Sequence, residues 1–238
     1  MVIDANGVHF AKLNDIVRQS GDKEIVINNA LGHRYIASGL SGRDIRINGT
    51  PGNALGCYLD GSVITVNGNA QDATGDTMNN GTIYVHGSAG DACGYGMRGG
   101  KIFIRGNVGY RAGIHMKEYK EHKPVIIVGG KAGDFLGEYQ AGGLLVVLGI
   151  GIDGASIGSF CGTGMHGGKI FVRNYLPQNL PPQVSVRRAK KEDLAEISEY
   201  VGEFCKTFGY DKNELLNGDY FLLTPNTKNP YHQIYTQN

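Results

Sequence analysis

The sequence lacks tryptophan and has little proline and few cysteines. Of its 238 residues, 7 are proline and 4 are cysteine, and no two cysteines stand at a C-x-x-C spacing. This scatter argues against a disulfide framework, a zinc site and a self-contained iron–sulfur cluster. Scattered thiols without such a framework fit a reducing compartment, and we expect the protein to be cytoplasmic.

An excess of charge of one sign and long apolar runs are also missing. The chain has 23 basic and 22 acidic residues, so there is no broad electrostatic attraction to nucleic acid or to a membrane surface. No apolar run reaches the roughly eighteen residues of a membrane-spanning helix. The opening MVIDANGVHF lacks the pattern of a signal peptide. We therefore expect neither a nucleic-acid partner nor a membrane.

Glycine, in contrast, is abundant. It accounts for 38 of the 238 residues, against an ordinary share of about 7 per cent. The pattern Gly-x-Gly-x-x-Gly begins at Gly94, Gly149 and Gly162. A dinucleotide-binding loop with this pattern opens a helix and has an acidic residue about twenty positions on. Here β-rich triplets follow two of the copies, and no acidic residue lies between Asp153 and Glu192, so the glycines are interpreted as architecture.

A nineteen-residue repeat accounts for these glycines. Two of its intervals, 24 and 25 residues long, are the same unit with insertions of five and six residues. A unit this short has no room for the helix of a βαβ crossover. It fits one coil of a parallel β-solenoid, in which neighbouring strands stack about 4.8 Å apart. Triplets rich in β-branched residues begin at Ile25, Ile45, Ile64, Ile83, Ile102, Ile126, Leu145 and Ile170.

The sequence therefore predicts an all-β solenoid of about seven coils, in the middle of three segments. Residues 1–24 form an N-terminal cap with one short helix that ends near Gly21, and residues 25–174 form the coils. Residues 175–238 form a proline-rich linker, an amphipathic helix from about Lys191 to Phe208, and an irregular aromatic tail. We expect the linker to let this end of the chain pack along the solenoid or against a partner.

Two rows of side chains have predicted places in the coils. The first and third residues of each triplet should point inward and the middle one outward. The middle row starts polar, with Arg46 and Thr65, and becomes apolar by Phe103 and Phe171, so we expect the C-terminal helix to cover its apolar part. A second row stands fourteen residues after the triplet starts and should form a core ladder. It contains Met78, Met97, Met116, Gln140 and Met165.

The residues do not form a catalytic constellation, and we predict no catalytic, cofactor-binding or metal-binding residue in this chain. Cys93 and Cys161 occupy a slot that is Leu55 in another coil, which fits buried thiols and not a nucleophile. The charged insertion 117–124 is either a solvated loop or a docking site, and the sequence leaves both open. Hydrogen-bonded structural histidines are expected in three different slots, at His86, His115 and His166.

Four motifs carry a resemblance to a known family: GNAQD at Gly68, GYRAGIHMKEY at Gly109, GGKAGDFLGEY at Gly129 and GTGMHGG at Gly162. They resemble the C-terminal β-helical, GXGXG-type domain of the glutamate synthase large (alpha) subunit. The resemblance is closest to the stand-alone form of archaea and some bacteria. It covers residues 1–175, and the ending NPYHQIYTQ is also similar. It implies a right-handed, single-stranded parallel β-helix.

The resemblance also implies a function. Glutamate synthase converts glutamine and 2-oxoglutarate to glutamate, with ammonia passing from a glutamine amidotransferase to an FMN and iron–sulfur synthase. The β-helical domain carries no catalytic residue and holds the other two together. We therefore expect a non-catalytic scaffold with these two partners. FMN and the iron–sulfur cluster are expected on the partner subunits and no cofactor on this chain. Whether the chain also forms a homo-oligomer is left open.

Two alternatives remain. Related β-helices form a non-catalytic subunit of formylmethanofuran dehydrogenases and subunits of methylglutamate synthase systems, and only the neighbouring subunits would separate these scaffolds. A self-sufficient hexapeptide-repeat acyltransferase is a rival of another class. Its coil of about eighteen residues and its catalytic histidine fit this sequence poorly, and acetyl-CoA binding would test it.

Overall fold

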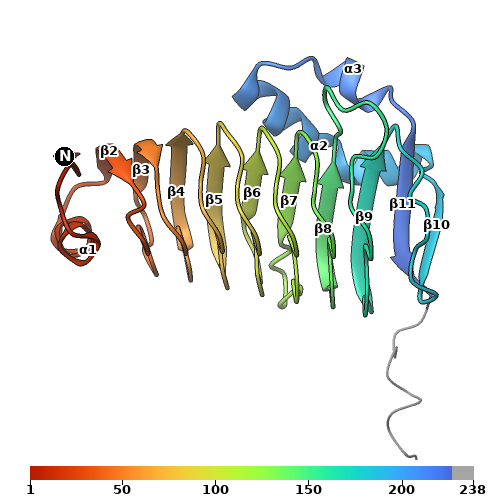
Figure 1. Cartoon of the computed structure of the whole chain (residues 1–238), viewed down its shortest axis with the longest axis horizontal. Helices are drawn as coiled ribbons and strands as arrows, with labels where there is room; N and C mark the ends of the chain where they lie inside the picture. Colours follow the sequence, from red (N-terminus) through yellow and green to blue (C-terminus); the bar gives the residue numbers. More distant parts are fainter. Residues whose placement is uncertain (227–238) are drawn as a thin grey trace, which may run out of the picture.

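The computed structural model describes residues 1–226. The fold is mainly β, with one long, largely parallel sheet of 11 strands. Figure 1 shows the strands side by side along the long axis of the molecule, in chain order until the C-terminal end. The parallel strands are β1 (Val2–Asp4), β2 (Glu24–Leu31), β3 (Asp44–Thr50), β4 (Asp60–Asn67), β5 (Asn80–Val85), β6 (Lys101–Ile104), β7 (Val125–Val128), β8 (Ala141–Val147) and β9 (Gly167–Arg173).

The strand register confirms the repeat. Ile64 pairs with Ile45 on one side and with Ile83 on the other, so each triplet stands beside the triplet one coil away. A second contact between coils runs through single parallel bridges that link Ala70 to Ala89 and Ala89 to Val108. Two separate ladders per coil are the arrangement that a solenoid requires. The right-handed sense of winding stays a prediction.

A third part of each coil has an unusual backbone. Within six-residue turn stretches, every second residue has a positive φ, for example Ala73 (+56°), Gly75 (+71°) and Thr77 (+49°). This conformation costs a non-glycine residue about 1 kcal/mol. The cost is offset because the stretch bonds to both neighbouring coils. Gly75 N donates to Leu55 O (2.8 Å), and Thr77 N donates to Tyr95 O (2.7 Å). The turn stretches are residues 34–39, 53–58, 72–77, 91–96, 110–115, 134–139 and 159–164.

The core inside the coils is built as the two predicted rows require. The first and third triplet residues, such as Ile64 and Val66, are fully buried in one continuous cluster. The four methionines of the ladder are buried in the same cluster, and Gln140, in the same slot, is also fully buried. The prediction of a methionine core ladder is confirmed.

The C-terminal segment packs along the solenoid. Helix α2 (Lys191–Phe208) begins and ends as the periodicity predicts. Asp193 accepts a hydrogen bond from Lys190 N (2.7 Å) at its start, and Gly209 (φ +79°) ends it. Side chains of α2 such as Phe204 form a second buried cluster with Phe103 and Phe171 of the middle row, which confirms that the helix covers this row. The remaining elements are α1 (Phe10–Gln19), β10 (Val184–Arg188), α3 (Lys212–Leu216) and β11 (Tyr220–Pro225).

Two features at the ends differ from the sequence-based expectation. The segment after α3 is not irregular, because β11 pairs antiparallel with β9 and β10 pairs antiparallel with β11. Its unbroken apolar run hides the strand period, since both faces of β11 are buried, at Leu222 against α2 and at Leu223 in the solenoid core. The predicted cap also contributes β1, which extends the sheet, and α1 ends at Gln19 with Ser20 as its C-cap. The motif NPYHQIYTQ lies outside the described residues.

A pair of glycine substitutions measures how tightly the coils pack. Gly113 (φ +70°) and Gly151 (φ +72°) have the same backbone conformation, but a Cβ on Gly113 would meet Leu145 Cδ2 at 2.8 Å while one on Gly151 would meet nothing within 4 Å. Gly151→Ala should therefore cost about 1 kcal/mol from the backbone alone. Gly113→Ala should cost about 1–3 kcal/mol more, because it overpacks the core. Urea unfolding of both variants gives the difference, and equal losses would contradict this packing.

Ion pairs to Glu196 give the C-terminal helix a defined pH dependence. Lys123 and Lys169 each donate to this carboxylate at 2.6 Å. Burial opposes ionisation, but the two lysines outweigh it and lower the pKa of Glu196 from its usual 4.5. The unfolded chain therefore takes up a proton at higher pH than the folded chain, so the stabilisation is complete above about pH 4.5 and is lost as pH falls through the lowered pKa.

The variant Glu196→Gln should lose about 1 kcal/mol of unfolding free energy at pH 7, a small amount because the side chain is 25% exposed. Its difference from the parent protein should disappear in acid. Chemical unfolding of both proteins between pH 7 and pH 3 checks this, with Glu121→Gln, exposed and without an ion pair among the described residues, as the control. A difference that persists unchanged at pH 3 would contradict the role given to the carboxylate.

Candidate functional site

The residues singled out for chemistry do not come together. Among residues 1–226 there is no group of three or more His, Cys, Asp or Glu side chains that could hold a metal ion. In the same part of the chain, no helix is both long and apolar enough to cross a membrane. His86, His115 and His166 lie in separate coils, as their slots predict.

The histidines differ in their surroundings. Only His166 has a hydrogen bond to its ring among the described residues, from Nδ1 to Gly164 O at 3.1 Å. His86 packs edge-on against Phe208, and burial lowers its pKa, with Arg105 adding to the effect. His115 is exposed and stacks on Tyr139. The expectation of hydrogen-bonded structural histidines is therefore wrong for His86 and His115, whose rings contact aromatic rings instead.

The two thiols in the shared slot are part of the core. Cys93 and Cys161 are buried in the main cluster, and this burial raises the pKa of both thiols to about 12. A neutral thiol without access to solvent is a poor nucleophile. The interpretation of these cysteines as buried side chains is confirmed.

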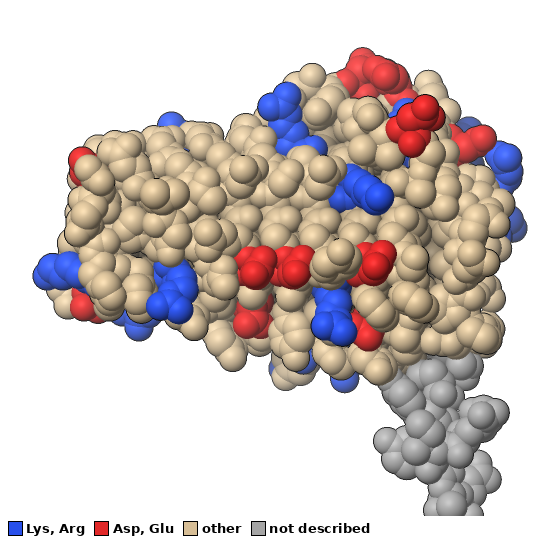
Figure 2. Space-filling model, viewed as in Figure 1, with Lys and Arg blue, Asp and Glu red and all other residues tan. Residues whose placement is uncertain are grey.

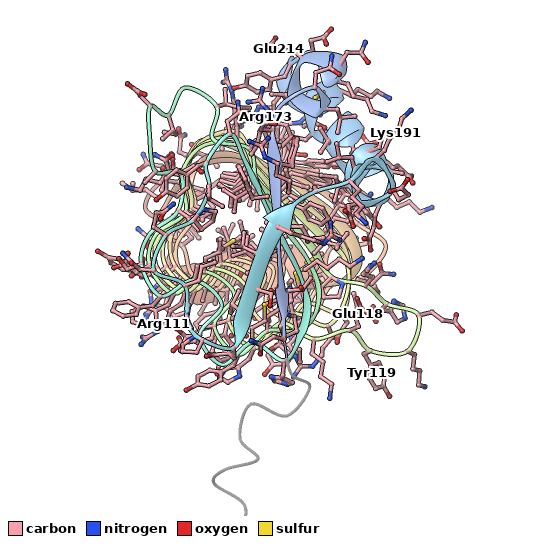
Figure 3. The ribbon with its side chains drawn as sticks, turned by 90° about the vertical axis from the view of Figure 1, so that its right-hand side faces the viewer. Arg111, Glu118, Tyr119, Arg173, Lys191 and Glu214 are labelled. Atoms are coloured by element: carbon pink, nitrogen blue, oxygen red, sulfur yellow. The ribbon has the colours of Figure 1, made fainter. Side chains whose placement is uncertain are left out.

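The most distinctive surface of the molecule is formed by the turn stretches. Their outward residues stand in columns, one residue per coil, on a backbone fixed by hydrogen bonds from both sides. Arg111, in one of these stretches, and Lys191, at the start of α2, lie on opposite sides of the molecule (Figure 3). Several aromatic side chains of the stretches are exposed to solvent, which we call the aromatic columns. They are Tyr35, Tyr58, Tyr95, Tyr110 and Phe160.

An acidic column runs beside the aromatic ones. Asp72 and Asp91 each accept a hydrogen bond from the main-chain N of the residue one coil further on, at 2.9 and 2.8 Å. Asp134 does the same for Ser159 N at 2.8 Å. Figure 2 shows acidic side chains in a row along this face. In the coil between Asp91 and Asp134, Tyr110 takes the place of the aspartate.

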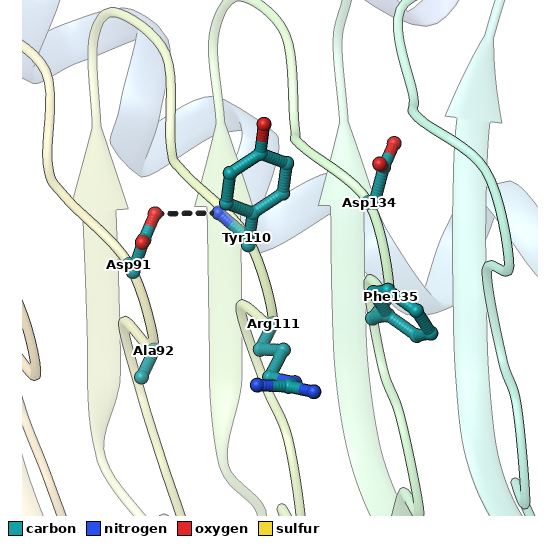
Figure 4. A pocket seen from close by; sticks show the side chains of 6 residues that line it. All are labelled: Asp91, Ala92, Tyr110, Arg111, Asp134 and Phe135. Atoms are coloured by element: carbon teal, nitrogen blue, oxygen red, sulfur yellow. Dashed lines mark hydrogen bonds between the residues drawn. The ribbon is translucent and has the colours of Figure 1, made fainter.

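The exchange of aspartate for Tyr110 borders a depression of about 400 Å³ (Figure 4). The Arg111 guanidinium lies 5.3 Å from the centre of the Phe135 ring and its Nε donates to Glu138 at 3.0 Å. Phe135 also stacks on Phe160 with 5.0 Å between ring centroids. Aromatic rings and an arginine at the centre of a patch are typical of sites where another protein binds.

A second depression, of about 390 Å³, lies where the turn stretches lead into the next strands. Arg98 and Lys117 contribute positive charge, and the exposed rings of Tyr95 and His115 contribute an aromatic wall. Its other lining residues are Thr77, Gly96, Tyr139, Ala141 and His166.

The insertion 117–124 is fixed at its base and free at its tip. Gly143 N donates to Glu118 Oε1 at 2.9 Å, and Lys123 reaches Glu196 of α2. Tyr119 and His122 form an antiparallel bridge, and Tyr119 projects from the body of the molecule (Figure 3). Docking and a solvated loop both stay open for this segment.

The aromatic columns were not predicted from the sequence. Their signal is present in the repeat, because Tyr58 and Tyr139 stand thirteen residues after a triplet start and Phe135 and Tyr35 stand in another common slot. Large side chains are not expected at these positions, because left-handed backbone disfavours them. Only the hydrogen bonds to neighbouring coils make these residues tolerable there.

The fold and this surface define a repetitive β protein with a patterned exterior and a closed core. The chain belongs to the GXGXG motif family, whose model matches residues 9–225. It is 45% identical over 251 residues to the uncharacterized protein MJ1350 of Methanocaldococcus jannaschii, a match that covers 99% of this chain and 96% of the relative.

A solved structure shares the fold. It is a chain in the X-ray crystal structure of the formyltransferase/hydrolase complex (FhcABCD) from Methylorubrum extorquens in complex with methylofuran. The TM-score is 0.64 at 23% sequence identity, and the match covers 87% of this chain and 79% of that chain. The GXGXG part of the expected resemblance is thus confirmed, as is the mainly β fold.

The buried thiols predict a specific pattern of reactivity. With a pKa near 12, Cys93 and Cys161 should hold about a thousandfold less thiolate than an ordinary cysteine at the same pH. In the folded protein, iodoacetamide should leave both unmodified, whereas all 4 cysteines should react after unfolding in urea. Mass spectrometry of the peptides reads this out, and rapid labelling of native Cys93 or Cys161 would argue for an open core.

Proposed function

We propose that this chain is a non-catalytic scaffold subunit of a multi-subunit enzyme complex. The observation that carries the proposal is the aromatic columns: large exposed rings such as Tyr110 and Phe160, 55% and 56% exposed, stand on a backbone that is held by its neighbours. Aromatic groups on a rigid support bind a partner with little loss of conformational entropy.

A long sheet stabilised coil by coil is suited to keep two catalytic subunits at a constant distance. An intermediate that passes between two sites is lost when the sites move relative to each other, so a stiff spacer improves transfer. Helix α2 adds to this stiffness, because Glu203 accepts from Tyr84 Oη and from Lys101, both at 2.6 Å, and ties the helix to two coils. This role needs no reactive group on the chain itself.

Two versions of the proposal differ in the partners. The solved complex of similar fold contains a formyltransferase and a hydrolase, and this likeness favours a β-helical subunit of a formyl-transferring complex. The GXGXG family and the four long motifs support the other version, a glutamate synthase-type complex. There the partners would be a glutamine amidotransferase and a synthase that carries FMN and an iron–sulfur cluster. Among the comparisons, the formyl-transferring version has the more direct support.

The first test is purification of the native complex from its own host, with mass spectrometry of the co-purified chains and an absorbance spectrum. Formyltransferase and hydrolase subunits would establish the first version. A flavin spectrum with an amidotransferase chain would establish the second. A chain that is recovered only with copies of itself would overturn the scaffold proposal.

A pair of surface variants tests the part played by the aromatic columns. Tyr110→Ser with Phe160→Ser should weaken partner binding by roughly thirtyfold, because buried aromatic anchors dominate interfaces. Leu31→Ser is the matched control, since Leu31 is a large, exposed apolar residue outside the turn stretches. All variants should keep the unfolding midpoint of the parent. Equal retention of the partners by the double variant and by the control would assign binding to another face.

A further inference from the structure

We propose that the depression around Arg98 and Lys117 is a binding site for a small organic anion, one that carries a carboxylate or phosphate group next to a flat part. The site is separate from the Tyr110 depression and does not depend on the scaffold proposal. Its volume, about 390 Å³, lies within the range of small-molecule sites in proteins.

The two cations of the site have no acidic partner. The ammonium group of Lys117 makes no hydrogen bond or ion pair with any residue from 1 to 226. Arg98 uses one nitrogen, Nη1, to donate to Gly96 O (2.6 Å) and His115 O (3.1 Å). These two bonds hold the guanidinium in place and leave its other N–H groups without a partner among the same residues. A fixed guanidinium with donors to spare is suited to bind carboxylate or phosphate.

The carboxylates nearest in sequence to the site are engaged elsewhere. Asp76 accepts from the Thr77 hydroxyl at 2.7 Å. Glu118 accepts from Gly143 N at 2.9 Å, and Glu138 accepts from Arg111 at 3.0 Å. The residues that line the depression include no acidic side chain. Its positive charge is therefore left for a ligand.

The wall of the site provides a surface for the flat part of a ligand. His115 stacks on Tyr139 at an angle of 9° between the rings, and Tyr95 meets His115 edge-on with 5.9 Å between centroids. His166 binds Gly164 O through Nδ1, so Nδ1 carries a hydrogen in that contact, and Nε2 is left for a ligand oxygen. Anchoring cations, a flat aromatic wall and one further polar group are the parts that small-molecule sites combine.

The left-handed backbone explains why these groups converge. His115 stands at a left-handed position (φ +54°), and Gly96 occupies the same slot one coil earlier (φ +57°). A side chain at Gly96 would project into the space that Arg98 and Tyr95 border, since a Cβ there comes within 4.0 Å of Arg98 Nη1. The absence of a side chain at Gly96 therefore keeps the depression open.

The test is a titration of the full chain, followed by the ring signals of His115 and His166 in NMR spectra at constant ionic strength. The probes are inorganic phosphate and citrate, with a glutamate-rich peptide as a third arm and chloride as the reference. Saturable shifts at both histidines with phosphate or citrate are expected. Saturation with the peptide alone would retain the site and assign the carboxylate to a protein segment.

Matched variants separate a site from general charge attraction. Lys117→Gln should weaken binding about tenfold, because it removes one charged hydrogen bond. Lys131→Gln, an exposed lysine whose side chain lies outside the depression, should change the affinity less than twofold. Gly96→Ser, which narrows the site without a change of charge, should also weaken binding. Equal effects of the two lysine variants, or shifts that chloride reproduces, would overturn the proposal.

Discussion

Hydrogen bonds between the main chains of successive coils are the constraint on which the rest of this structure depends. Each coil has too little interior to be stable alone, and its N–H and C=O groups find partners only in the coil before and the coil after. The same bonds keep residues such as Phe135 (φ +59°) and His115 (φ +54°) in a conformation that they would otherwise avoid. Stability and local strain therefore have one common source.

Because the backbone is fixed in this way, the outward side chains are free to vary. Tyr110 stands where neighbouring coils have Asp91 and Asp134, yet the coil keeps its hydrogen bonds to both neighbours. One exchange of this kind turns part of an acidic row into an aromatic depression. The surface chemistry of the protein is thus arranged in columns, and each coil can change it independently of the fold.

The parts of the fold that follow a period could be predicted from the sequence. The nineteen-residue spacing predicts the strand register, the methionine ladder and the row under α2, because each of these depends on apolar side chains that must be buried. The antiparallel pairing of β11 could not be predicted, since its residues Tyr220 to Leu223 are apolar without alternation. The surface sites were also missed. Their residues come from adjacent coils and gain their meaning only from the turn geometry between Arg98, Lys117 and His166.

The reversal of strand direction at the C-terminal end has a consequence for aggregation. A stack of parallel strands is a template on which further copies could add, as in amyloid fibres. Here the edge of β9 is occupied by the antiparallel β11, and at the other end Leu13 and Val17 of α1 are buried in the core of the first coils. The two exposed edges, β1 and β10, are only 3 and 5 residues long. A chain built by stacking is thereby given a definite length and protected from end-to-end polymerisation.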